Sequence, residues 1–250
     1  MIRGTADLIE LARAAPDIGA YPADTVLLNN VVCVQATMEM RNSAREAVLP
    51  PSLHPTIPAS MSIQVWKVGD SPWGAFSMAM ARISCRSGVR ARGFVSAAFA
   101  STPAATRALR GGYGFPIQLA EIKLQHGYSG ITAQVRWNNR TVLELRGVDP
   151  EPMGHDDVQY TGSLTLANTP NGLRLLQVEA EYQSTQVERL RPTLQTFVGA
   201  DWGNPLLIPA RTVSASVAHA AIELPPIRFV CRPDELAFTG TETVKQSDPA

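Results

Sequence analysis

Lysines are the first candidates for chemistry in this sequence, because an amine can act as a nucleophile. Lys67 lies in the segment SIQVWKV and Lys123 in the segment GFPIQLAEIKL. The pKa of a lysine is ordinarily about 10.4, so the amine reacts at neutral pH only where burial lowers that pKa. Side chains alternate along a strand, which places Lys67 on the face opposite to Gln64 and Trp66. Lys123 is expected to be a charge at the end of a strand, so neither lysine is the favoured nucleophile.

Residues that bind metals or cofactors are scattered along the chain rather than grouped. The sequence has no Cys-x-x-Cys pair, no Gly-x-Ser-x-Gly, no phosphate-binding loop and no dinucleotide fingerprint. The segment RGGYGFP is rich in glycine but is not expected to open a helix, which argues against a phosphate site. The segment DPEPMGHDD, residues 149–157, is expected to be a solvated loop. We therefore expect no metal and no cofactor, with these histidines on the surface or in loops: His54, His126, His155 and His219.

The composition indicates a folded chain without a nucleic-acid or membrane partner. Of 250 residues, 45% are hydrophobic and 18% are charged, which leaves enough apolar surface for a large core. The 22 basic residues balance the 22 acidic residues, so no overall field attracts nucleic acid or an anionic membrane. One arginine cluster surrounds Ser87-Gly88, where alternating charges predict a solvated hairpin: Arg82, Arg86, Arg90 and Arg92.

Cysteine usage and the apolar pattern favour a cytoplasmic protein. The three cysteines lie far apart, so no disulfide framework is expected. The N-terminal segment lacks an apolar stretch with a small-residue cleavage site, and no run of 18 apolar residues is present.

The pattern of short apolar runs predicts a protein made mainly of antiparallel strands. Residues 5–15 are expected to form a short amphipathic helix capped by Thr5 or Asp7. Asn138-Asn139 is expected to be a two-residue hairpin turn, because asparagine tolerates a positive φ. The alanine-rich segment 205–225 is expected to be a buried helix, followed by a last strand at 226–231. The other predicted strands are 30–38, 62–68, 74–85, 93–100, 131–137, 141–148, 163–169 and 173–183.

We expect one domain over residues 1–250, because the sequence has no repeat and no Gly/Ser-rich linker. Residues 1–24 form its N-terminal helix and arm, and residues 238–250 are expected to be a frayed polar tail.

Four segments in order resemble the successive blocks of acetoacetate decarboxylases. These are LPPSLHP (49–55), GDSPWGAFSMAMARISC (69–85), TRALRGGYGFPIQLAEIKL (106–124) and the closing segment 194–230. The resemblance implies an α+β fold, mainly a closed or nearly closed antiparallel β-barrel with helices packed around it and the active site inside. It also implies a homo-oligomer. The resemblance also implies a mechanism, in which a lysine forms a Schiff base with a β-keto acid. Burial activates that lysine by lowering its pKa.

The sequence departs from the family at the positions that carry this mechanism. Ile117 occupies the position of the nucleophilic lysine and Gln118 that of the adjacent lysine. Met78 stands where the family has a pocket glutamate, and Gln64 where a second carboxylate is usual. The family's N-terminal arginine, which receives the substrate carboxylate, has no clear counterpart. Isoleucine and methionine cannot form an imine or move a proton, so decarboxylation by the family mechanism is not expected.

The replacements predict a mostly apolar cavity for a small hydrophobic molecule with a few carbonyl or hydroxyl groups. Alternation places Phe76, Met78, Met80 and Arg82 on one face of a strand. Arg110 is expected either to pair with a carboxylate such as Glu121 or to face the cavity. The alternative to a cavity is a collapsed core. The residues expected to line or flank the cavity are Gln64, Trp66, Phe76, Met78, Met80, Phe115, Ile117 and Trp202.

Three functions remain open. The leading hypothesis is an enzyme of specialised metabolism that holds a polyketide-like or terpenoid-like substrate for cyclisation, isomerisation, a pericyclic step or dehydration, with Gln64 as its catalytic hydrogen-bonding group. The second is a non-catalytic small-molecule binding protein. The third is a keto-acid lyase or aldolase that uses Lys123, which lies where decarboxylases carry a lysine in addition to the nucleophile.

Overall fold

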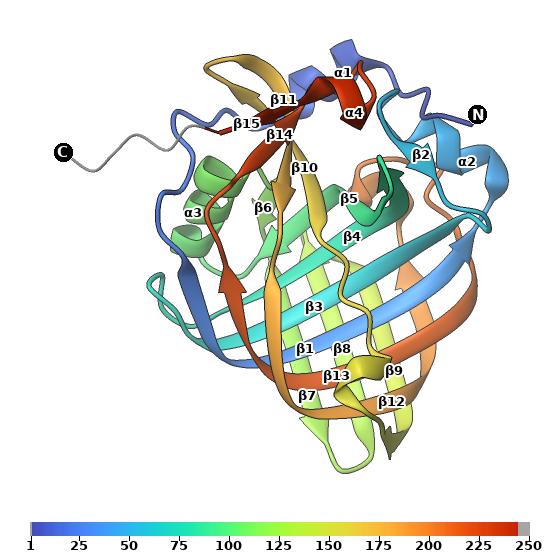
Figure 1. The fold of residues 1–250 in the computed structure, drawn as a ribbon. Helices are drawn as coiled ribbons and strands as arrows, with labels where there is room; N and C mark the ends of the chain where they lie inside the picture. The colour runs from blue at the N-terminus through green and yellow to red at the C-terminus, as the bar shows by residue number, and fades with distance from the viewer. Residues whose placement is uncertain (1, 245–250) are drawn as a thin grey trace.

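One sheet dominates the protein, as a computed structural model that describes residues 2–244 shows (Figure 1). Its strands follow the order β15-β14-β11-β10-β5-β4-β3-β1-β13-β12-β9-β8-β7, with β2 beside β4 and β6 beside β5. The strands are β1 (Val26–Met40), β2 (His54–Pro55), β3 (Ser60–Asp70), β4 (Phe76–Ser87), β5 (Arg90–Ala100), β6 (Ile117–Leu119), β7 (Glu121–Gly127), β8 (Gly130–Trp137), β9 (Arg140–Pro152), β10 (Ser163–Thr169), β11 (Gly172–Val178), β12 (Glu181–Phe197), β13 (Pro209–Leu224), β14 (Phe229–Cys231) and β15 (Thr241–Thr243).

The sheet is mixed and open, so the expected closed antiparallel barrel is not confirmed. Most neighbouring strands are antiparallel, but β5 pairs in parallel with both β6 and β10. The hydrogen-bonded order ends at β7 on one side and at β15 on the other. The parallel β5–β6 pair needs a crossover connection, and helix α3 (Pro103–Tyr113) supplies it.

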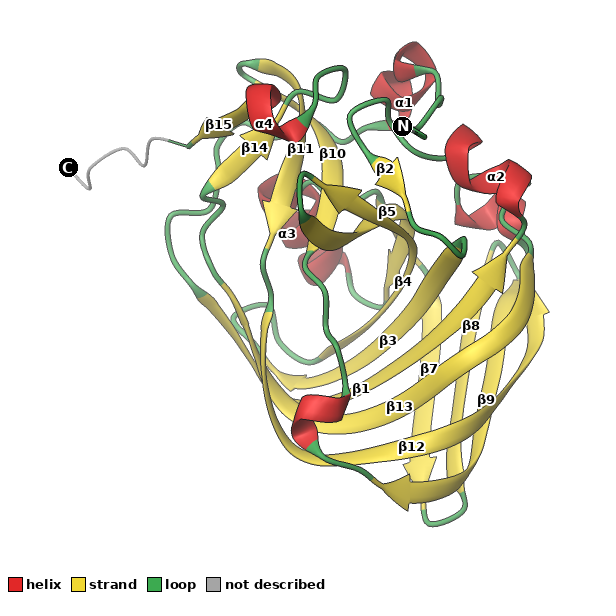
Figure 2. Ribbon diagram, turned by 45° about the vertical axis from the view of Figure 1, so that its right-hand side comes forward, coloured by secondary structure: helices red, strands yellow, loops and turns green. Residues whose placement is uncertain are grey.

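The helices are short and lie at one end and one side of the curved sheet (Figure 2). Helix α1 (Leu8–Ala14) confirms the predicted N-terminal helix, and the Asp7 side chain caps it by accepting a hydrogen bond from the backbone N–H of Ile9. None of the helices in residues 2–244 has the length and hydrophobicity of a transmembrane segment. The remaining helices are α2 (Asn42–Ala47), α4 (Ala237–Gly240) and the 3-10 turns η1 (His155–Asp157) and η2 (Gly199–Trp202).

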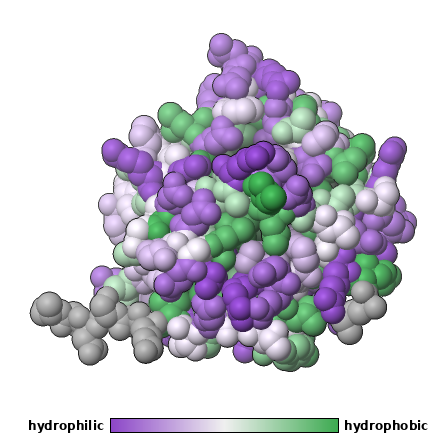
Figure 3. Space-filling view, turned by 90° about the horizontal axis from the view of Figure 1, so that it is seen from above, coloured by the Kyte–Doolittle hydropathy of each residue, from purple (hydrophilic) through white to green (hydrophobic). Residues whose placement is uncertain are grey.

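Two buried clusters lie on opposite faces of the central strands. Side chains from β1, β3 and β4 on one face, such as Val34 and Ile63, pack with residues of β7, β8 and β9. The opposite face carries Trp66 and Met78, and it packs with residues of α3, β10 and β11. Viewed from the end at which α1 and α4 lie, the surface shows a hydrophobic patch ringed by hydrophilic residues (Figure 3).

Most strands lie where the sequence predicted them, and the hairpin at Asn138-Asn139 is confirmed by the positive φ of both residues, 49° and 60°. The helix predicted over 205–225 is wrong, because this segment is strand β13. Its backbone pairs with β1 on one side and β12 on the other, and these two ladders outweigh the helix propensity of its alanines.

Two further differences concern the ends of elements. The strand predicted over 173–183 is divided between β11 and β12, which occupy separate places in the sheet. The tail expected to fray from residue 238 contributes to α4 and β15, and β15 pairs with β14. The rest of the predicted tail, residues 245–250, lies outside the described residues.

Gly114 ends α3 and turns the chain into β6. Its φ is 64°, in the left-handed region that glycine adopts without strain. A Cβ at this position would lie 2.9 Å from the Cβ of Ala167 on β10. The Thr165 hydroxyl donates a hydrogen bond of 2.6 Å to the carbonyl of Tyr113 just before the turn. The glycine-rich segment therefore closes a helix against β10.

We expect Gly114→Ala to lower the free energy of unfolding by about 1–3 kcal/mol, because the alanine combines a positive φ with a short contact. Gly111→Ala is the matched control, since Gly111 lies in α3 and a Cβ added there would meet nothing within 4 Å. This control should be neutral or stabilising by about 0.5–1 kcal/mol. Urea unfolding measures both, and equal effects would contradict the role given to Gly114.

Candidate functional site

Backbone register aligns several predicted site residues in one row across five strands. Gln35 pairs with Gln64 on β3, Gln64 with Met80 on β4, Met80 with Ala98 on β5, and Ala98 with Ile117 on β6. Neighbouring strands lie about 4.8 Å apart, so Gln64 and Ile117 are roughly 14 Å apart along the sheet. The amide and the residue at the lysine position therefore share a row without being neighbours.

The next row on the same face is apolar. Cys33 pairs with Trp66, Trp66 with Met78, and Met78 with Ala100. These side chains are at most 2% exposed and belong to the cluster that also contains Phe76, Met80, Phe115 and Ile117. Met78, Met80 and Ile117 are at most 1% exposed, and they line none of five cavities found in the described residues. These side chains are closely packed in this conformation.

Two tyrosines that were not predicted as site residues complete this cluster. The ring of Tyr160 stacks on that of Tyr182 with 3.9 Å between centroids, and Trp66 meets Tyr182 edge-on at 6.1 Å. Three buried polar atoms here form no hydrogen bond of standard geometry in the described residues: Trp66 Nε1, Tyr160 Oη and Gln64 Oε1. Their polar neighbours are the Cys33 thiol, which interacts with Trp66 and Tyr160 and is only a weak acceptor, and the Tyr182 hydroxyl, which interacts with Gln64. Buried polar groups are nearly always well paired in folded proteins, so these atoms retain hydrogen-bonding capacity for a ligand or water.

The orientation of Gln64 follows from its neighbours. Gln35 Oε1 accepts hydrogen bonds from Arg82 Nη2 at 3.2 Å and from Gln64 Nε2 at 2.6 Å. An arginine only donates, so Gln35 must present its oxygen to Arg82 and Gln64 must present its NH₂ to that oxygen. Gln64 therefore offers an acceptor, Oε1, to the cluster. The Gln64 NH₂ group is bound to Gln35 and does not face the cluster.

The solvated hairpin predicted around Ser87-Gly88 is only half correct. Arg86 and Arg90 are exposed, but Arg82 and Arg92 are 2% and 8% exposed. The two exposed arginines flank the turn between β4 and β5, whereas Arg82 and Arg92 lie further along these strands, where the rest of the protein covers them. Alternation did predict the side on which Arg82 lies, with Met78 and Met80.

The ionisable groups of the cluster are protonated at neutral pH. Burial raises the pKa of the Cys33 thiol to about 12, and it also raises the pKa of the Tyr160 and Tyr182 hydroxyls. These groups are hydrogen-bond donors rather than bases. The cluster of described residues therefore offers neutral donors, one amide acceptor and the nearby Arg82 cation.

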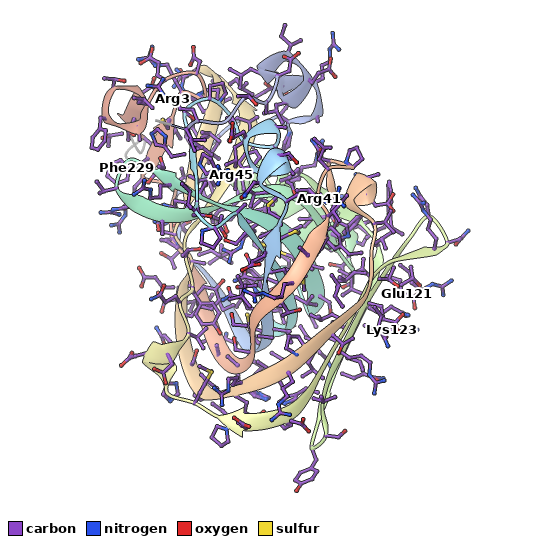
Figure 4. The ribbon with its side chains drawn as sticks, turned by 90° about the vertical axis from the view of Figure 1, so that its right-hand side faces the viewer. Arg3, Arg41, Arg45, Glu121, Lys123 and Phe229 are labelled. Carbon is purple, nitrogen blue, oxygen red and sulfur yellow. The ribbon has the colours of Figure 1, made fainter. Side chains whose placement is uncertain are left out.

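The described lysines lie away from this cluster. Lys123 on β7 is 62% exposed and pairs with Glu121 at 2.8 Å, and both side chains lie at the outer edge of the molecule (Figure 4). Lys67 is exposed on the face of β3 opposite to Gln64 and Trp66, as alternation predicted. Neither amine is enclosed by the protein.

Three other predicted site residues lie outside the cluster. Trp202 packs in the other core, edge-on to Phe99 at 4.8 Å, because Phe99 and its neighbour Ala98 point to opposite faces of β5. Gln118 is exposed. Arg110 is exposed and donates to the carbonyl of Ile117 at 3.5 Å. Its expected carboxylate partner Glu121 pairs instead with Lys123 and Arg136.

The chain belongs to the acetoacetate decarboxylase family. The family model described as acetoacetate decarboxylase matches residues 12–197, which is more than half of the chain. The family and the buried cluster together define the class of protein: a member of the acetoacetate decarboxylase family in which Ile117 and Met78, the residues that the sequence resemblance aligns with a lysine and a glutamate, are buried.

Solved structures show the same fold at low sequence identity. Acetoacetate decarboxylase from Legionella pneumophila is 19% identical with a TM-score of 0.73, over 83% of this chain and 88% of that one. An acetoacetate decarboxylase-like enzyme from Sphingomonas wittichii is 11% identical with a TM-score of 0.67, over 83% and 96%. The enduracididine biosynthesis enzyme MppR, complexed with a condensation product of pyruvate and imidazole 4-carboxaldehyde, is 17% identical with a TM-score of 0.65, over 82% and 88%. No curated protein matches the chain.

Ile117→Lys tests whether residue 117 faces an enclosed interior. Burial should lower the pKa of the new amine below its unfolded value of about 10.4, at a cost of about 1.4 kcal/mol for each pKa unit. The unfolded state then binds more protons between these two pKa values, so the stability of the variant relative to wild type should rise as pH increases towards 10.4. Urea unfolding between pH 7 and pH 10.5 measures this difference.

Gln118→Lys is the control for this experiment, since Gln118 is adjacent in sequence and exposed. Its stability relative to wild type should not change with pH. A pH-independent difference for Ile117→Lys as well would mean that residue 117 is not enclosed.

Proposed function

We propose that the protein is an acetoacetate decarboxylase-like enzyme of specialised metabolism that acts without a Schiff base. Its substrate would be a hydrophobic, polyketide-like or terpenoid-like molecule that undergoes cyclisation, isomerisation, a pericyclic step or dehydration. The observation that carries the proposal is the set of buried atoms without a hydrogen bond of standard geometry, Trp66 Nε1, Tyr160 Oη and Gln64 Oε1, in a cluster that buries neither a lysine nor a carboxylate among the described residues.

The hydrogen-bonding pattern of these atoms favours one kind of functional group. Trp66 Nε1 can only donate, while Gln64 Oε1 can only accept. An enolised β-dicarbonyl matches this pair, because it has one carbonyl acceptor and one hydroxyl donor. A donor aimed at a carbonyl oxygen stabilises the negative charge that develops there, which is typically worth a factor of 10²–10³ in rate. Holding a flexible chain near its reactive geometry adds up to ~7–11 kcal/mol in favourable cases.

The fold also supports chemistry other than decarboxylation. MppR, a structural relative, is described as a biosynthesis enzyme and holds a condensation product. At 17% identity this likeness concerns the fold alone, so it supports the proposal only by analogy.

A non-catalytic small-molecule binding protein is the second candidate. The observation that favours it is the close packing of Met78, Met80 and Ile117, which border no main cavity in the described part of the chain. Methionine side chains repack readily, so a ligand could be admitted by their rearrangement. A turnover assay separates the two candidates. The ligand of a non-catalytic binding protein would raise the melting temperature of the protein but would itself remain chemically unchanged.

A lyase or aldolase that uses Lys123 is disfavoured, because that amine is exposed and paired with Glu121. We expect that incubation with acetoacetate or pyruvate followed by borohydride leaves the intact mass of the protein unchanged, since no described lysine is buried. Ile117→Lys serves as the comparison, because it places an amine at the family position. A substrate-dependent adduct on the wild-type protein that disappears in Lys123→Ala would restore the third hypothesis.

Gln64→Ala should reduce turnover about 10-fold, because the variant loses one hydrogen bond from the substrate to the amide acceptor that faces the cluster. Lys123→Ala should keep most of the activity. Both variants are compared with wild type by incubating them with a panel of β-dicarbonyl and polyene compounds and separating the products by liquid chromatography with mass detection. Loss of activity in Lys123→Ala with retention in Gln64→Ala would reverse the assignment.

A further inference from the structure

A second polar region opens on the other side of Gln35. It is a cavity of about 350 Å³ between the sheet and the segment 153–161. Trp66, Met78 and Ile117 do not border it, so it is separate from the buried cluster. Most of the residues that line it carry hydroxyl, amide or guanidinium groups, among them Gln35, Ser62, Arg82, Ser84, Gln159 and Ser216.

Arg82 is the charged group at the base of this cavity. Its guanidinium is held by neutral acceptors only: Nε donates to Ser62 Oγ at 3.2 Å, Nη1 to Thr161 O at 2.9 Å and to Ser163 Oγ at 3.3 Å, and Nη2 to Gln35 Oε1 at 3.2 Å. A guanidinium has five N–H donors, so one donor on Nη2 remains for a ligand. No carboxylate among the described residues forms an ion pair with Arg82.

Arg92 is a second buried arginine of the same sheet, and its charge is paired with a carboxylate. It lies on the neighbouring strand, is 8% exposed, and forms an ion pair with Glu179. A buried charge without a counterion is costly, and proteins normally pair it as Arg92 is paired. Arg82 is more deeply buried, at 2% exposed, and lacks such a partner among the described residues.

The surroundings leave the positive charge of Arg82 uncompensated. Burial lowers the pKa of Arg82, and the ionisable groups that interact with it, Tyr182, Cys33 and Cys85, are buried and protonated at neutral pH. At the rim, Arg189 is neutralised by Glu151. Asp157 also borders the cavity, but it is exposed and its carboxylate accepts from the backbone N–H of Gly154. Solvent screens an exposed charge, so the base of the cavity remains positive.

We propose that this cavity binds a small carboxylate that carries hydroxyl groups, with the carboxylate on Arg82. A single buried cation matches a singly charged oxyanion, and a charge-assisted hydrogen bond to a carboxylate is among the stronger polar contacts in proteins. The remaining wall supplies hydroxyl and amide partners for the hydroxyl groups of the ligand, including Ser84, Ser214, Ser216 and Gln159. Binding in this cavity requires no turnover, so a binding experiment tests this proposal independently of the proposed function.

Isothermal titration of the full chain with sodium D-glycerate tests this site, with sodium chloride used to keep the ionic strength constant. We expect glycerate to bind, butyrate to bind more weakly because it lacks hydroxyl groups, and glycerol to give no heat because it lacks charge. Arg82→Met should raise the Kd for glycerate about 10- to 100-fold, the equivalent of one hydrogen bond to a charged group. Arg92→Met is the matched control and should keep the wild-type Kd.

Ser216→Ala keeps the test decisive if Arg82→Met does not fold. It removes one hydroxyl from the wall and should raise the Kd for glycerate about 2- to 10-fold while leaving that for butyrate unchanged. Absence of glycerate binding to the wild-type protein would overturn the proposal. Equal Kd values for wild type and a folded Arg82→Met would do the same, as would inorganic phosphate binding more tightly than glycerate.

Discussion

The backbone register across β1, β3, β4, β5 and β6 is the constraint on which the rest of the structure depends. Side chains alternate with a period of two, so a slip of one residue would move a whole strand's side chains to the other face. The register places Gln64 and Met80 in one row and Trp66 and Met78 in the next. It extends to Ile117 only because α3 crosses over and Gly114 turns the chain into a parallel β6. The position of each side chain in the site is thus a property of the hydrogen-bonded ladder.

Electrostatics divide this face of the sheet into two regions that share Gln35. On one side, burial keeps the Cys33 thiol and the tyrosine hydroxyls protonated, so the interior is neutral and has no base among the described residues. On the other side, Arg82 is a desolvated cation held by neutral oxygens. Because Gln35 accepts from both Arg82 and Gln64, the cation also fixes which atom of Gln64 faces the neutral region. The proposed chemistry without an amine would therefore depend on this whole neighbourhood, rather than on Ile117 alone.

The sequence predicted correctly those features that depend on interactions between neighbouring residues. The cap at Asp7, the turn at Asn138-Asn139 and the alternation along β4 all follow from a few neighbouring residues, and the structure has them as predicted. Segment 205–225 was misassigned because its state is set by two partner strands distant in sequence. Tyr160 was missed because its place beside Tyr182 depends on how a loop crosses the sheet. Arg82 carried a usable signal, since alternation grouped it with Met78, but the surrounding arginines suggested a solvated hairpin.

An open sheet leaves two edges whose backbone groups could pair with another chain. Strand β7 presents Glu121 and Lys123 at alternate positions on its outer face, and their ion pair keeps charged groups along that edge. Strand β15 spans only Thr241–Thr243, too short to template a long intermolecular ladder. Charged side chains and short strands are the devices by which natural sheets avoid edge-to-edge aggregation. Both edges of the sheet therefore disfavour an intermolecular strand ladder that would extend it beyond one copy of the chain.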